Sequence, residues 1–433
     1  MKNSKRFCGL FCVNLLLILF FTCGLVLSVT SALSLVNING IGEFNLVILT
    51  PDESDYDGIL EFYDPNSETL TISVRADSST KSSSTYPSSV EIPSKIRVSG
   101  ETYTVTKVGL RDFSQCSRLT SITIPSSVTS IGSGAFSECS ALKSITVDSA
   151  NTTYYSYENG VYTADSNTLI IGCKNTIIKE GTTAIGGSAF YGCSSLTSIT
   201  IPSSVTSIGG NAFSYCSKLT SIEIPSSVTS IGSSAFEVCS ELASVSLGTG
   251  ILTISGFCFE FCSKLTSIEI PSSVTSIRSR AFSNCSALKS ITVDSANTTY
   301  YSYENGVYTA DSNTLIIGCK NTIIKEGTTV IGNSAFSGHF GLTSITIPSS
   351  VTSIGGNAFS YCSKLTSISI PEGVTSIGEY AFYGCSRLTS VNFENTSGWK
   401  AGSKSISSTN LANQSTAATY LSSTYRDETW TRS

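Results

Sequence analysis

The residues of this chain that could do chemistry are its cysteines, which recur at a fixed spacing. Successive positions are 23 residues apart or, at two steps, 54 residues apart, and His339 stands where one cysteine is missing. The series consists of Cys116, Cys139, Cys193, Cys216, Cys239, Cys262, Cys285, Cys362 and Cys385. Three chemistries are open to it: a metal site, disulfides between neighbouring repeats, or buried thiols that hydrogen-bond to the backbone.

The third chemistry fits the spacing best. A column that supplies one side chain per repeat does not bring four ligands around one ion. Stacked cysteines come close enough for disulfides, but their Cβ directions run parallel and suit the bond poorly. Free cysteine is among the most buried residue types. We therefore expect a column of small buried side chains, whose S–H groups pair with the backbone at a turn.

The sequence offers little else that could catalyse a reaction. His339 is the single histidine, and its place in the cysteine column predicts a core position rather than a cleft beside a nucleophile. The chain has no glycine-rich phosphate loop that opens a helix, no Cys-x-x-Cys and no acidic calcium loop. Glu223 and Glu269 would lie two repeats apart, about 10 Å, slightly beyond the glycosidase range. We expect no enzyme activity, no cofactor and no metal.

The cysteine spacing belongs to a sequence repeat that runs from about residue 105 to residue 391. In one unit, residues 199–201 read Ile-Thr-Ile and alternate as a half-buried strand does. Pro202 ends that strand because proline has no backbone donor. A second apolar pair, Val205 and Ile208, follows. Repeats this short stack into a solenoid, in which each coil depends on its neighbours.

A glycine follows the second apolar pair in most units, and we expect it to adopt positive φ at a tight corner. These glycines are Gly132, Gly186, Gly209, Gly232, Gly332, Gly355 and Gly378. Arg278 replaces the glycine in one unit, so that coil should differ locally.

One phenylalanine per unit predicts an aromatic ladder. Neighbouring strands lie about 4.8 Å apart, and each ring can bury roughly 150 to 250 Å². We expect a continuous spine of rings in the core. Its members are Phe113, Phe136, Phe190, Phe213, Phe236, Phe259, Phe282, Phe336, Phe359 and Phe382.

The full pattern, Leu-x-x-Ile-x-Ile-Pro-x-x-Val-x-x-Ile-Gly-x-x-Ala-Phe-x-x-Cys, resembles the BspA-like class of leucine-rich repeat. That class occurs in bacterial surface and secreted proteins and in some protist surface proteins. The resemblance implies a mainly β fold: a curved, right-handed solenoid of 23-residue coils with a parallel sheet on one face. It also implies binding rather than catalysis. Residues 102–109 resemble the lead-in coil of the family, and residues 393–433 resemble its closing cap.

The organisation that we predict has four parts. They are a signal peptide at residues 1–32, an N-terminal β cap and lead-in at 33–100, the solenoid at 101–393, and a C-terminal cap or tail at 394–433. Within the N-terminal cap, residues 58–63 and 69–74 read as a strand pair joined by a turn.

The beginning of the chain predicts export. Lys2, Lys5 and Arg6 precede an apolar run over residues 10–29, with small residues suited to cleavage after it. No second long apolar run follows, so we expect no transmembrane span. Cys23 leaves lipid anchoring as an alternative. The formal net charge of −5 argues against a nucleic-acid partner.

Two enlarged coils, at 148–178 and 294–324, interrupt the repeat with near-identical inserts. An Asn-Gly step in each predicts a hairpin. Both inserts concentrate tyrosines, which supply contact area at small entropic cost and are therefore ligand-binding candidates. The alternative is that the rings pack on the coil and stabilise it. The tyrosines are Tyr154, Tyr155, Tyr157, Tyr162, Tyr300, Tyr301, Tyr303 and Tyr308.

A second candidate surface is the outward side of the strands. Solenoids bind partners on such extended faces, although Ser and Thr could equally serve only to keep the face soluble. The variable outward positions that we single out are Thr200, Glu223, Ser246, Glu269 and Thr292. A threonine ladder also resembles an ice-binding surface, a remote possibility here because the glutamates interrupt it.

Together these observations predict a secreted or cell-surface protein that binds an extracellular protein or glycan, of host matrix or of neighbouring cells, as an adhesin or matrix-binding protein does. The alternative is a structural spacer of the cell envelope, in which the repeats only provide length. The ligand and the oligomeric state stay open.

Overall fold

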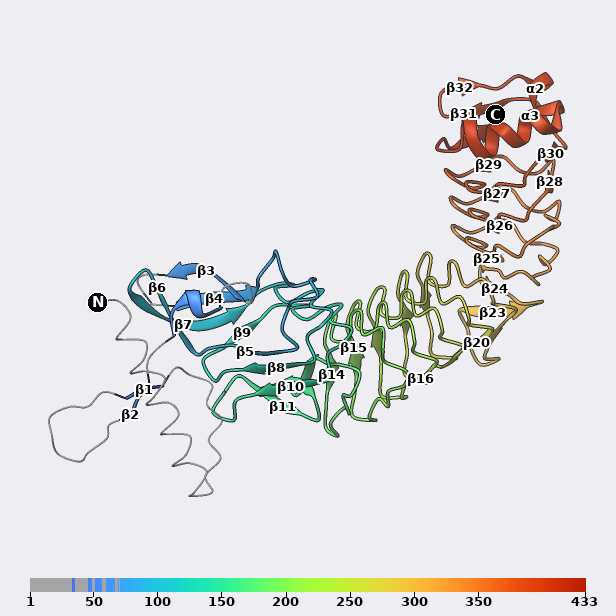
Figure 1. Cartoon of the computed structure of the whole chain (residues 1–433). Coiled ribbons are helices and arrows are strands. Elements are labelled where there is room, and N and C mark those ends of the chain that lie inside the picture. The colour runs from blue at the N-terminus through green and yellow to red at the C-terminus, as the bar shows by residue number, and fades with distance from the viewer. Residues whose placement is uncertain (1–32, 36–45, 49–50, 57–59, 67–68, 70) are drawn as a thin grey trace, which may run out of the picture.

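The computed structural model describes residues 33–35, 46–48, 51–56, 60–66, 69 and 71–433, so the predicted signal peptide lies outside the described residues. The chain is an elongated stack of coils with a sheet at its N-terminal end and short helices at its C-terminal end (Figure 1). The stack changes direction near β23 (Tyr300–Tyr303) and β24 (Gly306–Thr309). No helix in the described part is long and apolar enough to cross a membrane.

The mainly β solenoid is confirmed, and its most continuous sheet lies at the second apolar pair of each coil. There, two-residue strands pair in parallel and in register, so that Ile208, Ile231 and Ile254 follow one another along the sheet. We call this sheet the ladder. Its strands include β14 (Ala184–Ile185), β15 (Ser207–Ile208), β17 (Ser230–Ile231), β19 (Thr253–Ile254) and β21 (Ser276–Ile277), then β26 (Val330–Ile331), β27 (Ser353–Ile354) and β29 (Ser376–Ile377).

The first apolar pair forms shorter sheets on another side of the coil. Residues 199–201, expected as a strand, carry no strand assignment. The strands end at the residue before proline, as at Pro125 and Pro271, because proline cannot donate to a sheet. The strands on this side are β5 (Ser89–Glu91), β8 (Ser121–Ile124) and β10 (Ser144–Val147), then β16 (Ser221–Glu223) with β18 (Ser244–Ser246), β20 (Ser267–Ile270) with β22 (Ser290–Val293), and β28 (Ser367–Ile370) with β30 (Ser390–Phe393).

The prediction that the repeat glycines adopt positive φ was wrong. None of them has positive φ. They are needed because neighbouring coils touch backbone to backbone: a Cβ on Gly232 would lie 2.3 Å from the amide nitrogen of Gly210 in the preceding coil. Positive φ occurs instead at two other positions of each coil, filled for example by Asn211 and Tyr215.

The phenylalanine ladder forms, but in three runs rather than one. Within the runs, ring centroids are 4.9 to 5.4 Å apart and the rings are nearly parallel. The described rings do not stack across the enlarged coils. There Gly172 and Gly318 lie against the next rings, and a Cβ at Gly172 would be 2.1 Å from a ring carbon of Phe190. The core is correspondingly divided into three apolar clusters.

The cysteine column is confirmed as a set of free thiols, all of them buried except Cys193, which is half-buried. The Sγ of Cys216 donates to the carbonyl oxygen of Phe190 in the preceding coil at 3.2 Å, and this contact recurs along the stack. From Cys193 onward, burial raises the pKa of the column thiols, to about 12 for Cys239, so these thiols stay protonated and serve as donors between coils.

Each enlarged coil is an antiparallel meander of three strands. In the first, β11 (Tyr154–Tyr157), β12 (Gly160–Thr163) and β13 (Thr168–Ile171) follow one another, and β13 rejoins the ladder beside β14. In the second, β23 and β24 are followed by β25 (Thr314–Ile317), which rejoins beside β26. The hairpins that the Asn-Gly steps predicted are thus confirmed.

The meanders add strands on the ladder side alone. On the opposite side the flanking coils remain in direct contact, because the Asn284 amide donates to the Ser337 carbonyl at 2.9 Å across the second meander. Extra strands on one side of a stack turn its axis toward the other side, and Figure 1 shows this turn at the second meander. We call the second meander with its two flanking coils the elbow.

Sheets and helices close both ends. At the N-terminal end, the predicted strand pair forms β3 (Leu60–Asn66) and β4 (Thr71–Ala76). They share a sheet with β6 (Lys95–Val98) and β7 (Glu101–Val108), and β7 pairs with β9 (Ser130–Ile131) of the first regular coil. Outside this sheet lie β1 (Leu33–Leu35), β2 (Leu46–Ile48) and η1 (Glu53–Tyr56).

The C-terminal end folds more fully than its polar sequence suggested. Strand β33 (Trp430–Arg432) pairs with the last ladder strand, and Trp399 and Trp430 are fully buried. Strands β31 (Trp399–Ala401) and β32 (Lys404–Ser405) extend this sheet. Helices α2 (Ser408–Ala412), α3 (Gln414–Thr419) and η2 (Tyr420–Thr424), which the sequence did not predict, complete the end, with α2 and α3 packed on β30.

The contact role of the repeat glycines can be tested by substitution. We expect Gly232→Ala to lower the free energy of unfolding by about 1–3 kcal/mol, because the added methyl group forces neighbouring backbones apart. Gly341→Ala is the matched control, since its Cβ would meet only a lysine side chain at 3.4 Å. Urea unfolding followed by circular dichroism measures both; equal midpoints for the two variants would contradict the contact role.

Candidate binding face

The structure assigns half of the insert tyrosines to the core. Tyr154 and Tyr162 are buried, and so are their copies Tyr300 and Tyr308. The Tyr154 hydroxyl accepts a hydrogen bond from the Ile131 amide at 3.1 Å, where the ladder is interrupted. These four rings therefore brace the meander, and their candidacy as ligand contacts was wrong: alternation along a meander strand turns alternate rings into the core.

The other insert tyrosines are partly covered. Tyr155 stacks on Tyr162 with centroids 5.3 Å apart, and the Lys179 ammonium lies 4.6 Å from the Tyr155 ring and 5.8 Å from Tyr157. Tyr157 is 42 % exposed. The second meander repeats this arrangement with Tyr301, Tyr303 and Lys325. Each meander thus presents one well-exposed ring, Tyr157 or Tyr303, beside a lysine.

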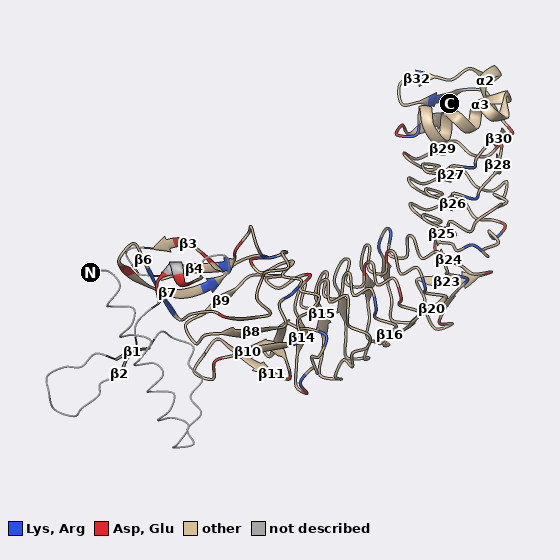
Figure 2. Cartoon of the chain, in the orientation of Figure 1, with Lys and Arg blue, Asp and Glu red and all other residues tan. Residues whose placement is uncertain are grey.

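The outward strand positions are exposed, as the sequence predicts, and some lie side by side. Glu223 pairs in register with Ser246, and Glu269 with Thr292. Thr200 is exposed as well. Figure 2 shows the charged residues dispersed along the coils. This surface remains a candidate on exposure alone.

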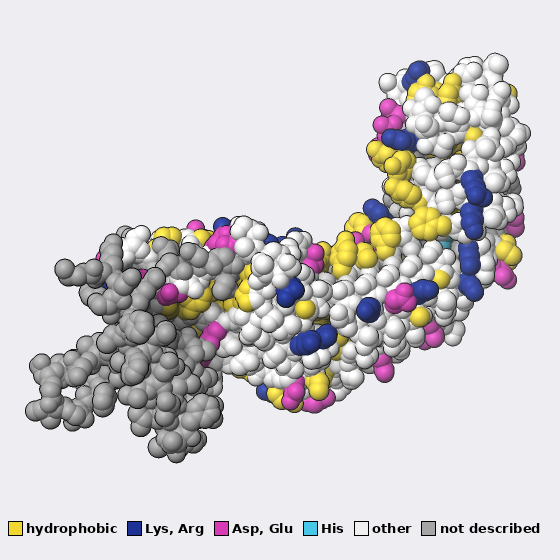
Figure 3. All heavy atoms as spheres, in the orientation of Figure 1, with side chains coloured by type: hydrophobic (Ala, Val, Ile, Leu, Met, Phe, Trp, Pro, Cys, Tyr) yellow, Lys and Arg dark blue, Asp and Glu magenta, His cyan; other side chains and the backbone are white. Residues whose placement is uncertain are grey.

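A surface that the sequence reasoning missed lies on the side where the coils stay in contact across the elbow. Exposed aromatic rings gather there along the inner side of the bend, which Figure 3 shows as hydrophobic side chains between white polar ones. We call this set the aromatic stripe. It consists of the exposed Tyr215, Phe257, Phe261, Tyr361 and Tyr380, together with the half-buried Tyr191 and Tyr383 that contact them.

Backbone hydrogen bonds join the coils that carry the rings to coils that carry none at these positions, so the stripe consists of separate groups of rings on one side of the stack. The Tyr215 amide donates to Glu237 in the next coil at 2.8 Å, and the Phe261 amide donates to Ser283 at 3.0 Å. Beyond the elbow, Tyr361 and Tyr383 bring their rings within 5.2 Å of each other. The stripe therefore runs along both arms of the bent stack.

The backbone under the stripe is strained. Tyr215, Phe257, Phe261, Tyr361 and Tyr380 have φ between 56° and 61°, the left-handed region. A bulky L-residue costs about 1–2 kcal/mol there, whereas glycine costs little. Other coils place Gly192, Gly338 or Asn357 at equivalent positions, and some place longer side chains such as Gln115 and Glu138 there. Exposed rings at strained positions add nothing to the core, so they point to function.

Arginines accompany the rings along the stripe. Guanidinium carbons lie over ring centroids for Arg111 and Tyr191 at 5.7 Å, for Arg280 and Phe257 at 5.0 Å, and for Arg426 and Tyr383 at 5.0 Å. A groove of about 380 Å³ runs beside the stripe from Arg280 to Tyr380. The face thus combines flat rings, guanidinium groups and a depression at the bend.

Arg280 lies where the two arms meet. It forms an ion pair with the buried Glu260 at 2.7 Å. The pKa of Tyr361 is raised, chiefly by its hydrogen bond to Tyr383, and the charge of Arg280 opposes that shift. Arg280 therefore acts on rings of both arms, Phe257 before the elbow and Tyr361 after it.

A comparison with known families decides the family of this chain. The profile described as "BspA type Leucine rich repeat region (6 copies)" matches residues 94–182, 183–305 and 316–423. The chain belongs to the BspA-type leucine-rich repeat family. This is a family of leucine-rich repeat cell surface proteins, and leucine-rich repeat proteins are generally non-enzymatic binding proteins.

Solved structures similar to this BspA-type chain include a leucine-rich cell surface protein from Faecalibacterium prausnitzii, 27% identical over 78% of this chain and 94% of that one, with a TM-score of 0.43. A leucine-rich repeat protein from Bacteroides ovatus is 23% identical over 77% and 92%, with a TM-score of 0.33. The pneumococcal vaccine antigen PcpA is 21% identical over 79% and 83%, with a TM-score of 0.39. No curated protein matches the chain.

His339 departs from the BspA-type pattern inside the core. It is 2 % exposed, and its Nδ1 has no hydrogen-bond partner in the described part of the chain. Burial lowers the pKa of the imidazole from 6.5 to about 4, against a hydrogen bond to the Gly318 carbonyl that acts in the other direction. The core position predicted for His339 is confirmed, and the side chain is neutral at pH 7.

The strain under the stripe predicts an unusual stability effect. Phe261→Asn should leave the free energy of unfolding unchanged or raise it by up to about 1 kcal/mol, because asparagine tolerates the left-handed backbone better than phenylalanine. Phe259→Ala, two residues away in the core, should lose about 3–5 kcal/mol. Thermal and urea unfolding compare the two. A clear loss of stability in Phe261→Asn would show that the exposed ring supports the fold.

Burial of His339 predicts acid sensitivity. In the unfolded chain the imidazole takes up a proton near pH 6.5, whereas in the folded protein it does so only near pH 4. Stability is therefore lost as the pH falls between these values, by about 3 kcal/mol in all. His339→Cys, which restores the residue of the other coils, should reduce the difference in unfolding free energy between pH 7 and pH 4. An unchanged pH dependence would contradict this account.

Proposed function

We propose that this chain is an exported BspA-type protein that binds an extracellular macromolecule at a cell surface, as an adhesin or matrix-binding protein, and that the aromatic stripe is its contact surface. The observation that carries the proposal is the strained backbone under exposed rings. A solenoid gains nothing in folding from a phenylalanine where glycine fits with less strain. The free energy that the left-handed backbone costs is offset when a partner covers the rings.

The composition of the stripe favours a protein partner. Tyrosine and arginine are the residues that contribute most to protein interfaces, where rigid rings bury much area at small entropic cost. Arg280 and Arg426 lie over rings of the stripe and supply directional donors at its edge. The inner side of a bent solenoid is a surface on which repeat proteins hold partners. Glycan binding is the alternative outcome of the experiment below.

Two further surfaces remain proposed contacts, with exposure as their support. One is the pair of exposed meander rings, Tyr157 and Tyr303. The other is the strand face with Glu223 and Glu269. The rings of Tyr157 and Tyr303 do not themselves stand at left-handed positions, and neither do the two glutamates, so both surfaces serve for comparison in the experiment.

The experiment measures binding of the mature full-length chain to a panel of purified extracellular matrix proteins and microbial surface polysaccharides by biolayer interferometry. The test variant combines Tyr215→Asn, Phe261→Asn and Tyr361→Asn, all at left-handed positions. We expect at least a tenfold loss of affinity for the panel member that binds, since central rings commonly contribute a factor of this size or more.

The matched control removes exposed apolar side chains outside the stripe. Ile177→Thr with Ile323→Thr changes residues that are each 62 % exposed and should leave binding intact. A third variant, Tyr157→Ser with Tyr303→Ser, tests the meander rings. Loss of binding in that variant alone would show that the binding site is on the meanders and not on the stripe. If the wild type binds no member of the panel, or if every variant binds as the wild type does, the envelope spacer is favoured and the proposal is overturned.

A further inference from the structure

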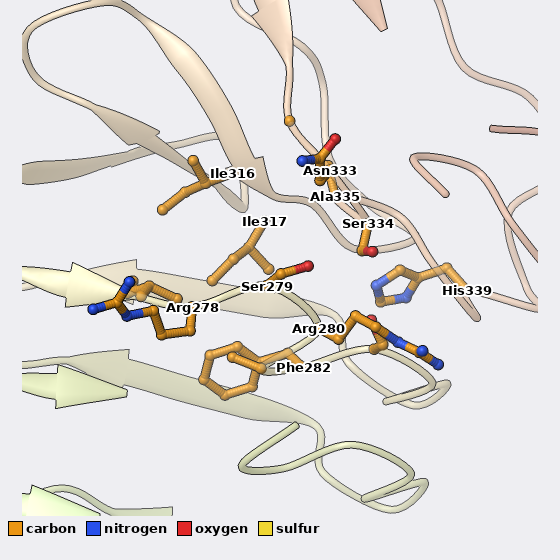
Figure 4. Close-up of a pocket in the computed structure, with 14 residues that line it drawn as sticks. Arg278, Ser279, Arg280, Phe282, Ile316, Ile317, Asn333, Ser334, Ala335 and His339 are labelled. Carbon is orange, nitrogen blue, oxygen red and sulfur yellow. The ribbon is translucent and has the colours of Figure 1, made fainter. Parts of the chain in front are cut away.

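A small pocket opens at the elbow, separate from the rings of the stripe (Figure 4). Its volume is about 210 Å³, below the roughly 300 Å³ at which drug-sized sites begin. Residues 277–283 line it from one coil, residues 332–335 and His339 from the next, and Ile316 and Ile317 from β25. The labelled side chains come from both coils, and the His339 ring points toward the space between them; the exposed Arg278 extends on the opposite side, with its guanidinium turned away from His339, so this side chain must swing inward to hold a ligand.

The chain contains its own comparison for this pocket. Residues 139–183 and 285–329, which include the two meanders, are identical letter for letter, so the two meanders differ only in the coils that flank them. The differing residues that line the pocket are Arg278, Arg280, Asn333 and His339, and the first copy has Gly132, Gly134, Gly187 and Cys193 in their places. Three glycines and a thiol have thus been replaced by two guanidinium groups, an amide and an imidazole around one cavity.

The imidazole of His339 is the clearest sign of a missing partner. Its Nδ1 is buried and unpaired within the described residues, and an unpaired buried polar atom costs about 1–3 kcal/mol. Because the neutral ring donates from its other nitrogen to the Gly318 carbonyl, Nδ1 can only accept a hydrogen bond, and no donor contacts it within the described residues. Ser283 Oγ is also unpaired. Ser214 in a regular coil shares that state, so the argument rests on His339.

The charges around the pocket define the ligand further. Arg280 is neutralised by Glu260, while Arg278 has no acidic partner among the described side chains. One uncompensated guanidinium favours a single negative charge, and guanidinium matches a carboxylate by two parallel hydrogen bonds. The acceptor Nδ1 and the Ser283 hydroxyl suit hydroxyl groups. Ile316 and Ile317 add apolar surface for the face of a ring.

We propose that the elbow pocket binds a small hydroxylated carboxylate with the chemistry of a uronic acid. Arg278 holds the carboxylate, Asn333 and Ser283 hydrogen-bond to polar groups of the ring, and a ligand hydroxyl donates to His339 Nδ1. This site does not depend on the stripe, because a macromolecule can cover the stripe whether or not the pocket is filled. The same chemistry occurs in a free sugar acid and at the end of an acidic polysaccharide.

The single histidine makes the test direct. The mature full-length chain, labelled with ¹⁵N-histidine, gives imidazole NMR signals from His339 alone. Titration with D-glucuronate should shift these signals in a saturable way, whereas D-glucose and acetate should bind at least tenfold more weakly. The charged groups near the ring are Arg278, Arg280, Lys320 and Glu260. A bound carboxylate adds a negative charge to them and should raise the pKa of His339 by about one unit.

The proposed ligand contacts can be tested by substituting pocket residues with those that stand at the equivalent positions around the first meander, since this chain already accommodates those residues there. Arg278→Gly should weaken glucuronate binding at least tenfold, and Asn333→Gly should weaken it less. Arg387→Gly removes an exposed arginine from another coil and should leave binding unchanged. Isothermal titration calorimetry measures His339→Cys, which has no imidazole signal, and should show weakened binding.

The outcomes separate this proposal from that for the stripe. No shift with glucuronate, equal binding of acetate or of glucose, or unchanged binding in Arg278→Gly would each overturn it. A triuronate that competes with glucuronate would identify the end of a polysaccharide as the natural form, and one that does not would identify a free sugar acid; both support the site. The triple stripe variant should bind glucuronate as the wild type does, so failure of one proposal leaves the other standing.

Discussion

The close approach of neighbouring coils is the constraint on which the rest of this structure depends. A 23-residue coil cannot bury its own apolar face, so rings stack at about 5 Å and glycines bring backbones into contact from one coil to the next. Thiols of the cysteine column donate across the same gap. Because every inward position serves this spacing, only outward positions and the breaks in the repeat are free to acquire other roles.

Both kinds of freedom are used in this chain. In the aromatic stripe, the stack holds left-handed backbone at two positions of each coil whatever residue stands there, since hydrogen bonds to the next coil fix both. Large rings can therefore occupy positions that would disfavour them in a less constrained chain. At the elbow, the meander enters on one side and leaves the coils in contact on the other, which bends the surface that carries the stripe.

The sequence predicted what is periodic. The coil, the phenylalanine ladder, the buried thiols, His339 in the core and the hairpins all follow from regular spacing or from Asn-Gly steps. It did not reveal that Gly232 serves contact rather than positive φ, because glycine satisfies both needs. It could not separate the buried Tyr162 from the exposed Tyr157, since the side of the meander that meets the core depends on pairing with distant strands. The stripe escaped notice because its rings occur only in some coils; the available signal was an aromatic residue where other coils have glycine or asparagine.

The duplication explains how the elbow could acquire a pocket. An identical meander in two places shows that the packing of the copied segment tolerates different flanking coils. Substitutions in those flanks, such as Arg278 for the residue equivalent to Gly132, leave the braces Tyr300 and Tyr308 in place. The copied segment therefore sets the backbone around the pocket, while the flanking coils provide the polar side chains that line it. Residues of the flanking coils can change without altering the meander.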